Sequence, residues 1–582
     1  MKLLTAVVAF AAVTGAGVWA LQGPIGQEAA VLVSYLAGFL SFLWLVGGGA
    51  AFLDWLHGRH TDHHAGGPAG FNLDHKVIGI QYIAVSMLVL AVSGLMALIM
   101  RAELARPGIQ FLSHDNYNAV MTMHGIGMVV VALTAIVGGL GNYVVPITIG
   151  AKDMAFPRLN ALSLWILPPA VLMLLAALAL GGMDTGWTAY PPLATRGGVG
   201  KMFFLLAFVT VGFSSIFGGV NTLTTILTMR AKGMTLRRLP IFAWSMFSAG
   251  VIMVMATSVV AASLIMSVSD RAFGTTFFNA AGGGTALLYQ HLFWFYSHPA
   301  VYIMILPAFG VILEILPVFC RKPLFGYNFA AASFVGIVAL SFVVWAHHTF
   351  TSGMWDLLKI PFMVLTEMIS IPTGVVFLSA LGTMWAGRMR LRAPMLWALG
   401  FLCHFLVGGL TGIFLADVPT DIHLHDTLFV VAHFHFTIVG GTIFSFFAGF
   451  YYWYPKMFGR MADETLAKAH FWLFSVGFNT IFLPLFYVGT QGGPRRTADY
   501  PPEFARPEMI ASVGAALAGL ATLVFFYNAL RSLWAGAPAG PNPWQAKTLE
   551  WTVSSPPPAE NFASAPQVTD APYDYGVVDA AA

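Results

Sequence analysis

The chain has 582 residues, of which 58% are apolar and only 9% are charged, a composition that no water-soluble domain of this size would tolerate on its surface. A formal charge of +3 gives no long-range field to attract nucleic acid, so nucleic-acid partners are excluded. Cys320 and Cys403 are too few for a disulfide framework or a zinc ribbon, and the sequence contains no Cys-x-x-Cys-His haem site. The sequence therefore predicts a membrane protein in which any metal is held by other side chains.

Fourteen apolar stretches are each about 20 residues or longer, the length that a helix needs to cross a bilayer. They are residues 4–22, 31–53, 77–100, 117–146, 161–181, 201–229, 241–268, 287–318, 328–350, 360–386, 394–416, 427–455, 467–489 and 509–532. The sequence thus predicts an all-α polytopic membrane protein. The first stretch could be a signal peptide, but it is long and shows no clear cleavage site, so we expect a retained anchor.

The pattern divides the chain into three expected parts. Residues 1–76 hold two N-terminal transmembrane helices and a polar, Gly-rich cytoplasmic linker, and residues 77–532 form a core of twelve helices. Residues 533–582 are rich in Pro and Ala and contain few large apolar side chains, so we expect an extended C-terminal tail that does not pack.

Clusters of lysine and arginine occupy alternate loops between the predicted helices. By the positive-inside rule these loops face the cytoplasm, which places both termini inside as well. The clusters are Lys152 and Arg158; Arg230, Lys232, Arg237 and Arg238; Arg321 and Lys322; Arg388, Arg390 and Arg392; and Lys456 and Arg460.

Seventeen histidines in so apolar a chain need an explanation, because an imidazole in hydrocarbon costs free energy unless something binds it. His433 and His435 are two residues apart, about 200° of rotation on a helix, so they point to opposite sides. Each could hold a separate cofactor. The alternative is a pair of core histidines bonded to the neighbouring backbone, which we consider a poor explanation for intramembrane ionisable groups.

A second group consists of His347 and His348, which are adjacent in an apolar span, and His298 in another span. Three neutral imidazoles suit copper, whereas magnesium or calcium would demand oxygen ligands. Tyr302 lies four residues after His298, on the same face of a helix. Its phenol could be bonded to the imidazole or could supply a proton and an electron.

His124 is the last intramembrane imidazole of this kind, and Gly125 and Gly127 beside it let a flat macrocycle approach the backbone. An iron with both axial positions filled only transfers electrons, while an iron with an open face binds a small gas. His124 with His435 would make the first kind. His433, facing a copper held by the other three imidazoles, would make the second.

Motifs spread over residues 74–530 resemble the haem-copper respiratory oxidases, in particular their catalytic subunit, subunit I of the cytochrome c oxidases. The motifs are Asp74-His-Lys, Arg101-Ala-Glu-Leu, Gly138-Gly-Leu-Gly-Asn142, Ile149-Gly-Ala-Lys-Asp153-Met-Ala-Phe-Pro-Arg-Leu-Asn160, Tyr289-Gln-His-Leu-Phe-Trp-Phe, Leu424-His425-Asp426-Thr and Pro494-Arg495-Arg496. The resemblance implies the oxidase fold of twelve helices, with two extra helices at the N-terminus.

The resemblance also implies a role for each intramembrane imidazole: His124 and His435 for the low-spin haem, His433 for the high-spin haem, and His298, His347 and His348 for copper, with Tyr302 as the cross-linked tyrosine. It implies that Arg495 and Arg496 bind haem propionates, for which the fixed donors and permanent charge of Arg are suited. It further implies a magnesium site at His425 and Asp426, near the outer surface and shared with a partner subunit.

For proton uptake the resemblance implies the channel called the D pathway, with Asp153, Asn160 and Asn142 at its mouth and neck. Ala300 stands where many members carry the glutamate that ends this channel. The preceding Tyr296 and Ser297 resemble a recognised variant in which a Tyr-Ser pair replaces that acid. Proton delivery from Asp153 is therefore still expected.

A second channel of the family, the K pathway, is expected to be disabled. Val376 stands at the position of its lysine and Leu313 at that of its serine, although Glu314 follows. On the same predicted helix as Val376, Glu367 and Ser370 form a polar stripe with Thr373, and Glu367 lies toward the depth of the metal site. Glu367 could be a solvated residue, a substitute proton relay, or part of a centre rebuilt for nitric oxide.

We therefore expect a terminal respiratory oxidase in a bacterial inner membrane that reduces dioxygen to water and couples this reaction to proton translocation. Electrons would come from cytochrome c through a two-copper centre in subunit II, because this chain lacks the cysteine pair that such a centre needs; subunit III and small membrane subunits are further expected partners. Two alternatives stay open: a nitric-oxide reductase, in which Glu367 would reach the copper ligands, and a proton-coupled transporter without cofactors. His404, alone in its span, is expected to be a satisfied core histidine.

Overall fold

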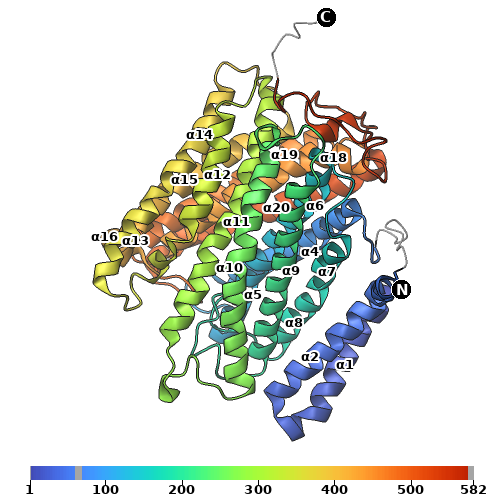
Figure 1. Cartoon of the computed structure of the whole chain (residues 1–582). Coiled ribbons are helices and arrows are strands. Elements are labelled where there is room, and N and C mark those ends of the chain that lie inside the picture. Colours follow the sequence, from blue (N-terminus) through green and yellow to red (C-terminus); the bar gives the residue numbers. More distant parts are fainter. Residues whose placement is uncertain (1, 59–68, 575–582) are drawn as a thin grey trace, which may run out of the picture.

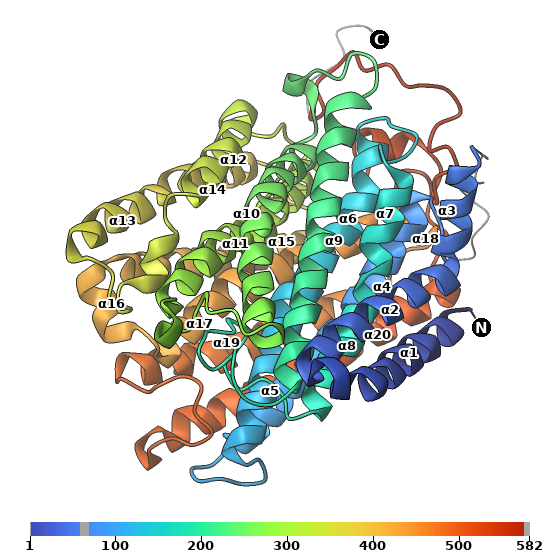
Figure 2. The same cartoon turned by 60° about the horizontal axis from the view of Figure 1, so that its bottom comes forward.

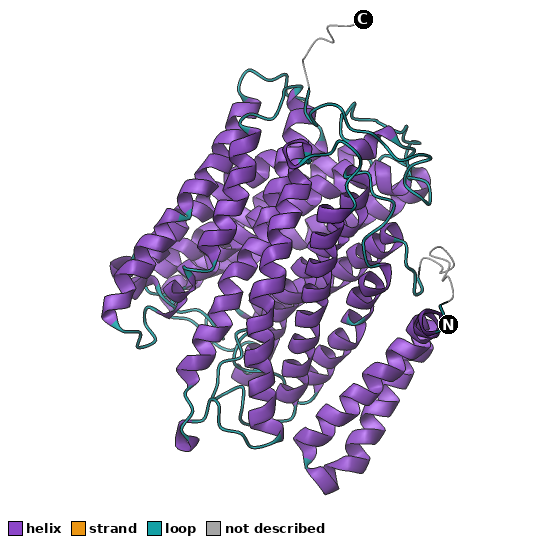
Figure 3. Ribbon diagram, in the orientation of Figure 1, coloured by secondary structure: helices purple, strands orange, loops and turns teal. Residues whose placement is uncertain are grey.

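The computed structural model describes residues 2–58 and 69–574, except for the side chains of residues 131–136. All regular structure in this part of the chain is helical, and only three isolated bridges join its loops (Figure 3). The helices follow one another as α1 (Lys2–Ile25), α2 (Gln27–Leu43), α3 (Gly49–Leu56), α4 (His75–Glu103), α5 (His114–Ile126), α6 (Leu133–Thr148), α7 (Pro157–Trp165), α8 (Leu167–Ala179), α9 (Gly200–Thr228), α10 (Ile241–Ala272), α11 (Ala286–Cys320), α12 (Tyr327–Ser341), α13 (Asp356–Met368), α14 (Ser370–Met384), α15 (Ala393–Ala416), α16 (Val418–Leu424), α17 (Leu428–Thr437), α18 (Phe444–Phe458), α19 (Glu464–Thr490) and α20 (Ala505–Ala535).

Thirteen helices within the described residues are long and apolar enough to cross a membrane, and they match thirteen of the fourteen predicted spans. The other predicted span, 117–146, coincides with α5, the π-helical turn η2 (Gly127–Ala132) and α6, which follow one another without a break. The side chains of residues 131–136 in this stretch lie outside the described part of the chain, so the stretch is not counted among the thirteen helices. The prediction of an all-α polytopic membrane protein is confirmed.

Local sequence signals set the ends of several helices. The side chains of Asp74, Ser113 and Asp463 each accept a hydrogen bond from a backbone N–H in the first turn that follows, which caps α4, α5 and α19. Helix α18 ends at Gly459, whose φ of 68° lies in the left-handed region that favours glycine. These signals are local, so the sequence pattern locates the helices well.

Helices α1 and α2 form a hairpin at the edge of the bundle, drawn in blue in Figures 1 and 2. The two helices approach closely at Gly38, where a Cβ atom would lie 2.2 Å from Thr14 Oγ1. An ion pair between Glu28 and Arg271 and a hydrogen bond between Tyr35 and Thr210 join α2 to α10 and α9. The two additional N-terminal helices are therefore present and are fastened to the core by polar contacts.

Helix α11 is the central rod of the molecule. Its apolar window is completely buried, and α10, α12, α15 and α18 pack around it. A helix that is apolar on every side is typically buried, and in α11 the surrounding helices bury it. This placement matters for function because α11 carries His298 and Tyr302.

The C-terminal segment differs from the expectation of a tail that does not pack. Residues 536–574, which we call the C-terminal cap, cover one end of the bundle (Figure 1, top). Trp544, Trp551 and Tyr573 are buried, and Lys456 of α18 donates hydrogen bonds to carbonyl groups of the cap. The expectation was wrong because a few well-placed aromatic residues are enough to pack a segment against an existing surface, even where the composition is poor in apolar residues.

The basic clusters of alternate loops gather on the face that the cap covers. Lys152 forms an ion pair with Glu560, and Arg321 donates to the carbonyl of Trp544 at 2.6 Å. Contacts of Lys232 and Arg460 with the cap, and of the Arg388 backbone with Cys320, place the other clusters there as well. The predicted segregation of these loops to one side is confirmed.

Candidate metal centre

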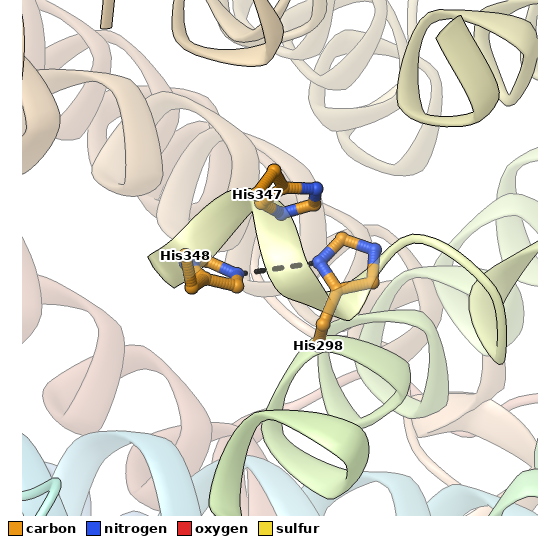
Figure 4. Close-up of side chains that lie close together, drawn as sticks. All are labelled: His298, His347 and His348. Atoms are coloured by element: carbon orange, nitrogen blue, oxygen red, sulfur yellow. Dashed lines mark hydrogen bonds between the residues drawn. The ribbon is translucent and has the colours of Figure 1, made fainter. Parts of the chain in front are cut away.

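Three imidazoles converge inside the bundle from two separate elements. His298 lies on α11, while His347 and His348 lie in the short 3₁₀ turn η5 (Trp345–Thr349) that follows α12. One ring nitrogen from each lies within 4.8 Å of the other two, and Nδ1 of His298 is 3.3 Å from Nε2 of His348 (Figure 4). Among the described residues this is the one group with three or more side chains able to hold a metal ion together. The expected convergence is confirmed.

The nitrogen separation fits a metal ion. Two imidazole nitrogens that each bind a metal at about 2.0 Å with a tetrahedral angle lie roughly 3.3 Å apart. No carboxylate or thiolate belongs to the group. A set of three neutral nitrogen donors suits copper and is a poor site for magnesium or calcium.

Two further side chains orient these imidazoles. His347 Nδ1 is 3.0 Å from Thr366 Oγ1, and the Thr366 hydroxyl donates its own proton to Phe362, so it accepts from His347. The Nε2 lone pair of His347 is therefore free for a metal. Trp294 stacks on His348 with ring centroids 3.7 Å apart. The sequence analysis assigned no role at the metal site to either residue, although Trp294 lies four residues before His298 and thus on the same helix face.

Tyr302 lies next to the three imidazoles. Its ring centroid is 4.9 Å from that of His298, one turn earlier on α11. His298 Nε2 is buried and has no hydrogen-bond partner. An orphaned nitrogen on the side of the ring opposite to the metal-facing Nδ1 is unusual, because buried polar atoms are nearly always paired.

His124 on α5 and His435 on α17 lie close enough to interact electrostatically. The carbonyl of Ser93 accepts a hydrogen bond from His124 Nδ1 at 2.9 Å, and that of Val431 accepts from His435 Nδ1 at 2.8 Å. Since a carbonyl can only accept, each ring carries its proton on Nδ1 and keeps the lone pair of Nε2 available. In both helices a wider π-helical turn begins within three residues of the histidine, a feature that is frequent at functional sites.

His433 occupies the opposite side of α17. Its Nδ1 is 3.0 Å from the carbonyl of Gly408 and 3.1 Å from Thr411 Oγ1, both on α15, so its Nε2 is also left free. His433 is close enough to His347 to interact electrostatically. A Cβ atom at Gly412 would lie 3.0 Å from the His433 ring, so the glycine permits a close approach.

The rings of His124, His433 and His435 are half-buried although they lie within the bundle. Part of each residue is therefore not covered by neighbouring side chains. Three imidazoles that are partly uncovered and have free Nε2 atoms are suited to be axial ligands of a flat macrocycle.

Arg495 and Arg496 lie in the loop after α19, at the end of the bundle opposite to the cap. Arg495 Nε donates to Asp426 Oδ1 at 2.6 Å, whereas none of the hydrogen bonds among the described residues involves the guanidinium of Arg496. Burial and the neighbouring charge of Arg495 together lower the pKa of Arg496 to about 10, although Asp426 opposes the change. A partly desolvated guanidinium without a partner fits a carboxylate of a bound ligand.

The residues expected to hold magnesium have protein partners. His425 Nδ1 is 3.1 Å from Asp421 Oδ2, and the Asp426 carboxylate is paired with Arg495. Burial raises the pKa of Asp426, but Arg495 and His425 lower it overall. Asp421 is an acid near this pair that sequence reasoning missed; it lies one helical turn before His425.

Several residues of the expected proton route carry buried polar groups without hydrogen-bond partners. Asn142 Oδ1, both side-chain polar atoms of Asn160, and Ser297 Oγ are buried without partners. The Ser163 hydroxyl donates to the carbonyl of Asn160 and is also hydrogen-bonded to the Tyr82 hydroxyl. The carbonyl of Ser163 accepts a hydrogen bond from the Ser214 hydroxyl. Unpaired polar groups of this kind are the usual partners of buried water.

The remaining residues of this expected route lie near its two ends. The Asp153 carboxylate accepts from the amide of Met154 in the loop after α6 and lies close enough to His75 to interact with it. Tyr296 is buried on α11 directly before Ser297.

Glu367 does not approach the three imidazoles. Its side chain is exposed on α13, and no hydrogen bond among the described residues joins its carboxylate to the ligands. The Ser370 hydroxyl bonds the Glu367 carbonyl, and Thr373 bonds that of Ile369, so the predicted stripe is satisfied by its own helix. Among the described residues, Glu367 therefore does not reach the copper ligands as it would in a nitric-oxide reductase.

Leu313 and Val376, at the positions of the second proton channel, line a small pocket without any polar side chain. The pocket is lined by Phe309, Ile312, Leu313, Val376, Phe377, Ala380, Phe401 and Leu402. His404 is a satisfied core histidine, as expected, with Nδ1 on the carbonyl of Gly400 and Nε2 on Asn479.

Comparisons with known proteins agree with this geometry. Residues 77–541 match the family model described as cytochrome c and quinol oxidase polypeptide I. The chain is 47% identical over 509 residues to cytochrome c oxidase subunit 1 of Thermostichus vulcanus, covering 87% of this chain and 92% of that protein, and 46% identical over 508 residues to the same subunit of Synechocystis sp., with the same coverage. In fold it is similar to a chain of a haem-copper terminal oxidase dimer solved by cryo-electron microscopy, with a TM-score of 0.67 at 22% identity, covering 80% of this chain and 84% of that one.

Proposed function

Because the chain belongs to the cytochrome c and quinol oxidase polypeptide I family, as subunit I of a cytochrome c oxidase, we propose that its six intramembrane imidazoles bind two haems and one copper ion and that dioxygen is reduced to water between them. The family implies haems and a copper ion, and the three converging imidazoles fit the copper site. The protein is thus an oxidoreductase of the respiratory chain and a multi-pass membrane protein.

The observation that carries the proposal is the arrangement of six imidazoles in two sets. His298, His347 and His348 hold the copper, and His433 holds the high-spin haem on the side of α17 that faces them. His124 and His435 hold the low-spin haem from two helices. When bound, these groups carry electrons to dioxygen and bind it. The protein fixes the ligand tautomers through Nδ1 hydrogen bonds and keeps the site dry with apolar helices.

Polar side chains near the site serve the reaction in two ways. The guanidiniums of Arg495 and Arg496 bind haem carboxylates at the end of the bundle opposite to the cap. The phenol of Tyr302 supplies a proton and an electron from a position bonded to His298. The Nε2 atom of His298, which is buried and has no hydrogen-bond partner, supports a bond between His298 and Tyr302.

Protons enter on the face with the basic loops, which we assign to the inside of a bacterial inner membrane. Asp153 takes up the proton, and water held by Asn142, Asn160 and the Ser163 hydroxyl carries it toward Tyr296 and Ser297. This route both supplies the reaction and translocates protons. Each charge moved across the membrane stores about 2.3 kcal/mol per 100 mV.

Electrons come from cytochrome c through a two-copper centre in subunit II, and subunit III and small membrane subunits complete the complex. Asp421 next to His425 supports a magnesium site at His425 and Asp426 on the subunit II side, because carboxylate oxygens are the ligands that magnesium prefers. The relatives of this chain are named as subunit 1, which supports an assembly of several subunits.

The test is direct turnover of the purified complex. We expect fast dioxygen consumption with reduced cytochrome c, slow consumption with a quinol, negligible nitric-oxide reduction, and acidification outside vesicles that contain the enzyme. A D153N variant should lose most proton uptake but keep both haems. Rapid reduction of nitric oxide with negligible use of dioxygen would contradict the proposal, and a colourless complex would indicate a transporter.

A further inference from the structure

Two glutamates are fully buried where the C-terminal cap meets the bundle. Glu314 lies near the end of α11 and is 2% exposed, and Glu550 lies in the short turn η8 (Leu549–Thr552) of the cap and is 1% exposed. Neither forms an ion pair within the part of the chain that the structure describes. A buried carboxylate without a cation is costly, so this pair needs an explanation.

Glu314 is held by the cap and by α10. The Tyr573 hydroxyl donates to Glu314 Oε2 at 2.7 Å and accepts from the amide of Ile241 at 2.7 Å. The amide of Phe242 also faces Oε2, at 3.4 Å. None of the hydrogen bonds among the described residues uses Oε1, so one oxygen of this carboxyl group is free to carry a proton.

Glu550 accepts on both of its oxygens. Thr148 of α6 donates to Oε2 at 3.0 Å, and Thr548 and Trp453 donate to Oε1 at 2.9 and 3.4 Å. Three donors favour the ionised form of a carboxyl group. The Phe242 ring contacts the Trp453 ring at 5.2 Å, so the two carboxyl groups lie on either side of one aromatic contact and interact electrostatically.

The cations on the adjoining elements donate to backbone carbonyls. Lys456 attracts Glu550, but its ammonium group donates to the carbonyls of Pro541, Val553 and Ser554. Arg321 and Lys322, at the end of α11, donate to carbonyls of the cap and of the loop after α14. The other titratable groups that face Glu314 are the phenols of Tyr573 and Tyr327, which are neutral at pH 7.

We propose that Glu314 and Glu550 form a proton-binding site, which holds one proton on Glu314 Oε1 at neutral pH and thereby fastens the C-terminal cap to α11. Two neighbouring carboxyl groups that form no ion pair cannot both ionise cheaply, so one of them keeps its proton. Loss of this proton at higher pH makes both groups negative. Repulsion then acts between the cap and the helix that carries His298 and Tyr302.

Infrared difference spectroscopy of the purified holoenzyme tests this site. In the C=O stretching region of protonated carboxyl groups, we expect a deuterium-sensitive band that disappears as the pH rises from 6 to 10. E314Q should abolish the band. E550Q should keep the band but shift its midpoint to lower pH.

Removing the negative charge of Glu550 makes ionisation of Glu314 easier, so the midpoint of the band should fall by about one pH unit or more. E367Q, which alters an exposed glutamate of α13, is the matched control and should leave band and midpoint unchanged. A band that survives in E314Q, or a midpoint that E550Q does not lower, would overturn the proposal.

Hydrogen–deuterium exchange of the cap gives a second readout that does not depend on E314Q folding. After correction for the intrinsic effect of pH, the amides of residues 545–574 in the wild-type complex should exchange faster above the midpoint of the infrared band than below it. In E550Q the cap should stay protected over the same range, because only one carboxyl group is left to ionise. Cap exchange with no such pH dependence in the wild type would contradict the fastening role.

Discussion

At the scale of single residues, the tautomer of each imidazole is set by what its Nδ1 atom contacts. His124, His433 and His435 donate from Nδ1 to backbone carbonyls, and His347 donates to the Thr366 hydroxyl. Each of these rings therefore keeps the lone pair of Nε2 available for a metal. Backbone acceptors cannot be removed by substitution, whereas the Thr366 hydroxyl is a side-chain acceptor and offers a direct test.

Replacing Thr366 with valine keeps the shape of the side chain and removes the acceptor of His347. We expect copper content or turnover to fall roughly 10- to 100-fold, the usual cost of losing a hydrogen bond to a metal ligand. Copper analysis and dioxygen consumption measure the effect. T373V is the control, because the Thr373 hydroxyl bonds only the carbonyl of Ile369; equal effects of the two variants would contradict the role of Thr366.

His435 and His404 give a matched pair of buried histidines with different expected outcomes. H435A should lose the low-spin haem, because no other described side chain on that face of α17 offers an imidazole to the iron. H404A should keep both haems and lose only some stability, since His404 bonds Gly400 and Asn479. Optical spectra of the two purified variants decide the point, and loss of a haem in H404A alone would reverse the assignment.

Helical periodicity explains which of these residues the sequence predicts. His298 and Tyr302 share one helix face, and His433 and His435 share one helix, so their relation follows from spacing alone. Thr366 reaches His347 from a different helix, and no local pattern indicates that contact. Asp421 lies one turn before His425 and was missed although the spacing was visible.

At the scale of elements, the C-terminal cap is the largest difference between expectation and structure. Composition alone suggested a segment that does not pack, because it measures how much apolar surface a segment has and not where that surface lies. Trp551 is 2% exposed, contacts Tyr452, and lies under the ammonium group of Lys456. The cap therefore depends on a few aromatic residues that fit the end of the bundle.

Truncation of Trp551 tests that dependence. W551A should destabilise the complex by about 3–5 kcal/mol, the range for removing a buried Trp or Phe side chain, and should lower the temperature at which the haem spectrum is lost on heating. W534A is the control, because Trp534 is 73% exposed on α20. Equal thermal stability of W551A and wild type would mean that the cap does not support the bundle.

At the scale of the whole molecule, charge and burial divide the chain into two ends with different tasks. The basic loops, the cap, and Asn142 and Asn160 lie at one end, and Arg495 and Arg496 lie at the other, with the imidazoles between them. An oxidase that takes protons from one side and electrons near the other needs this separation. The N-terminal hairpin adds two helices at the edge without contributing an imidazole to the site.

The number of haems and copper ions per chain tests the central claim most directly. Combined metal analysis and optical spectroscopy of the purified complex, with the copper of the partner subunit counted separately, should give two haem irons and one copper ion for each copy of this chain. A complex with one haem, or without copper in this subunit, would contradict the assignment of the six imidazoles.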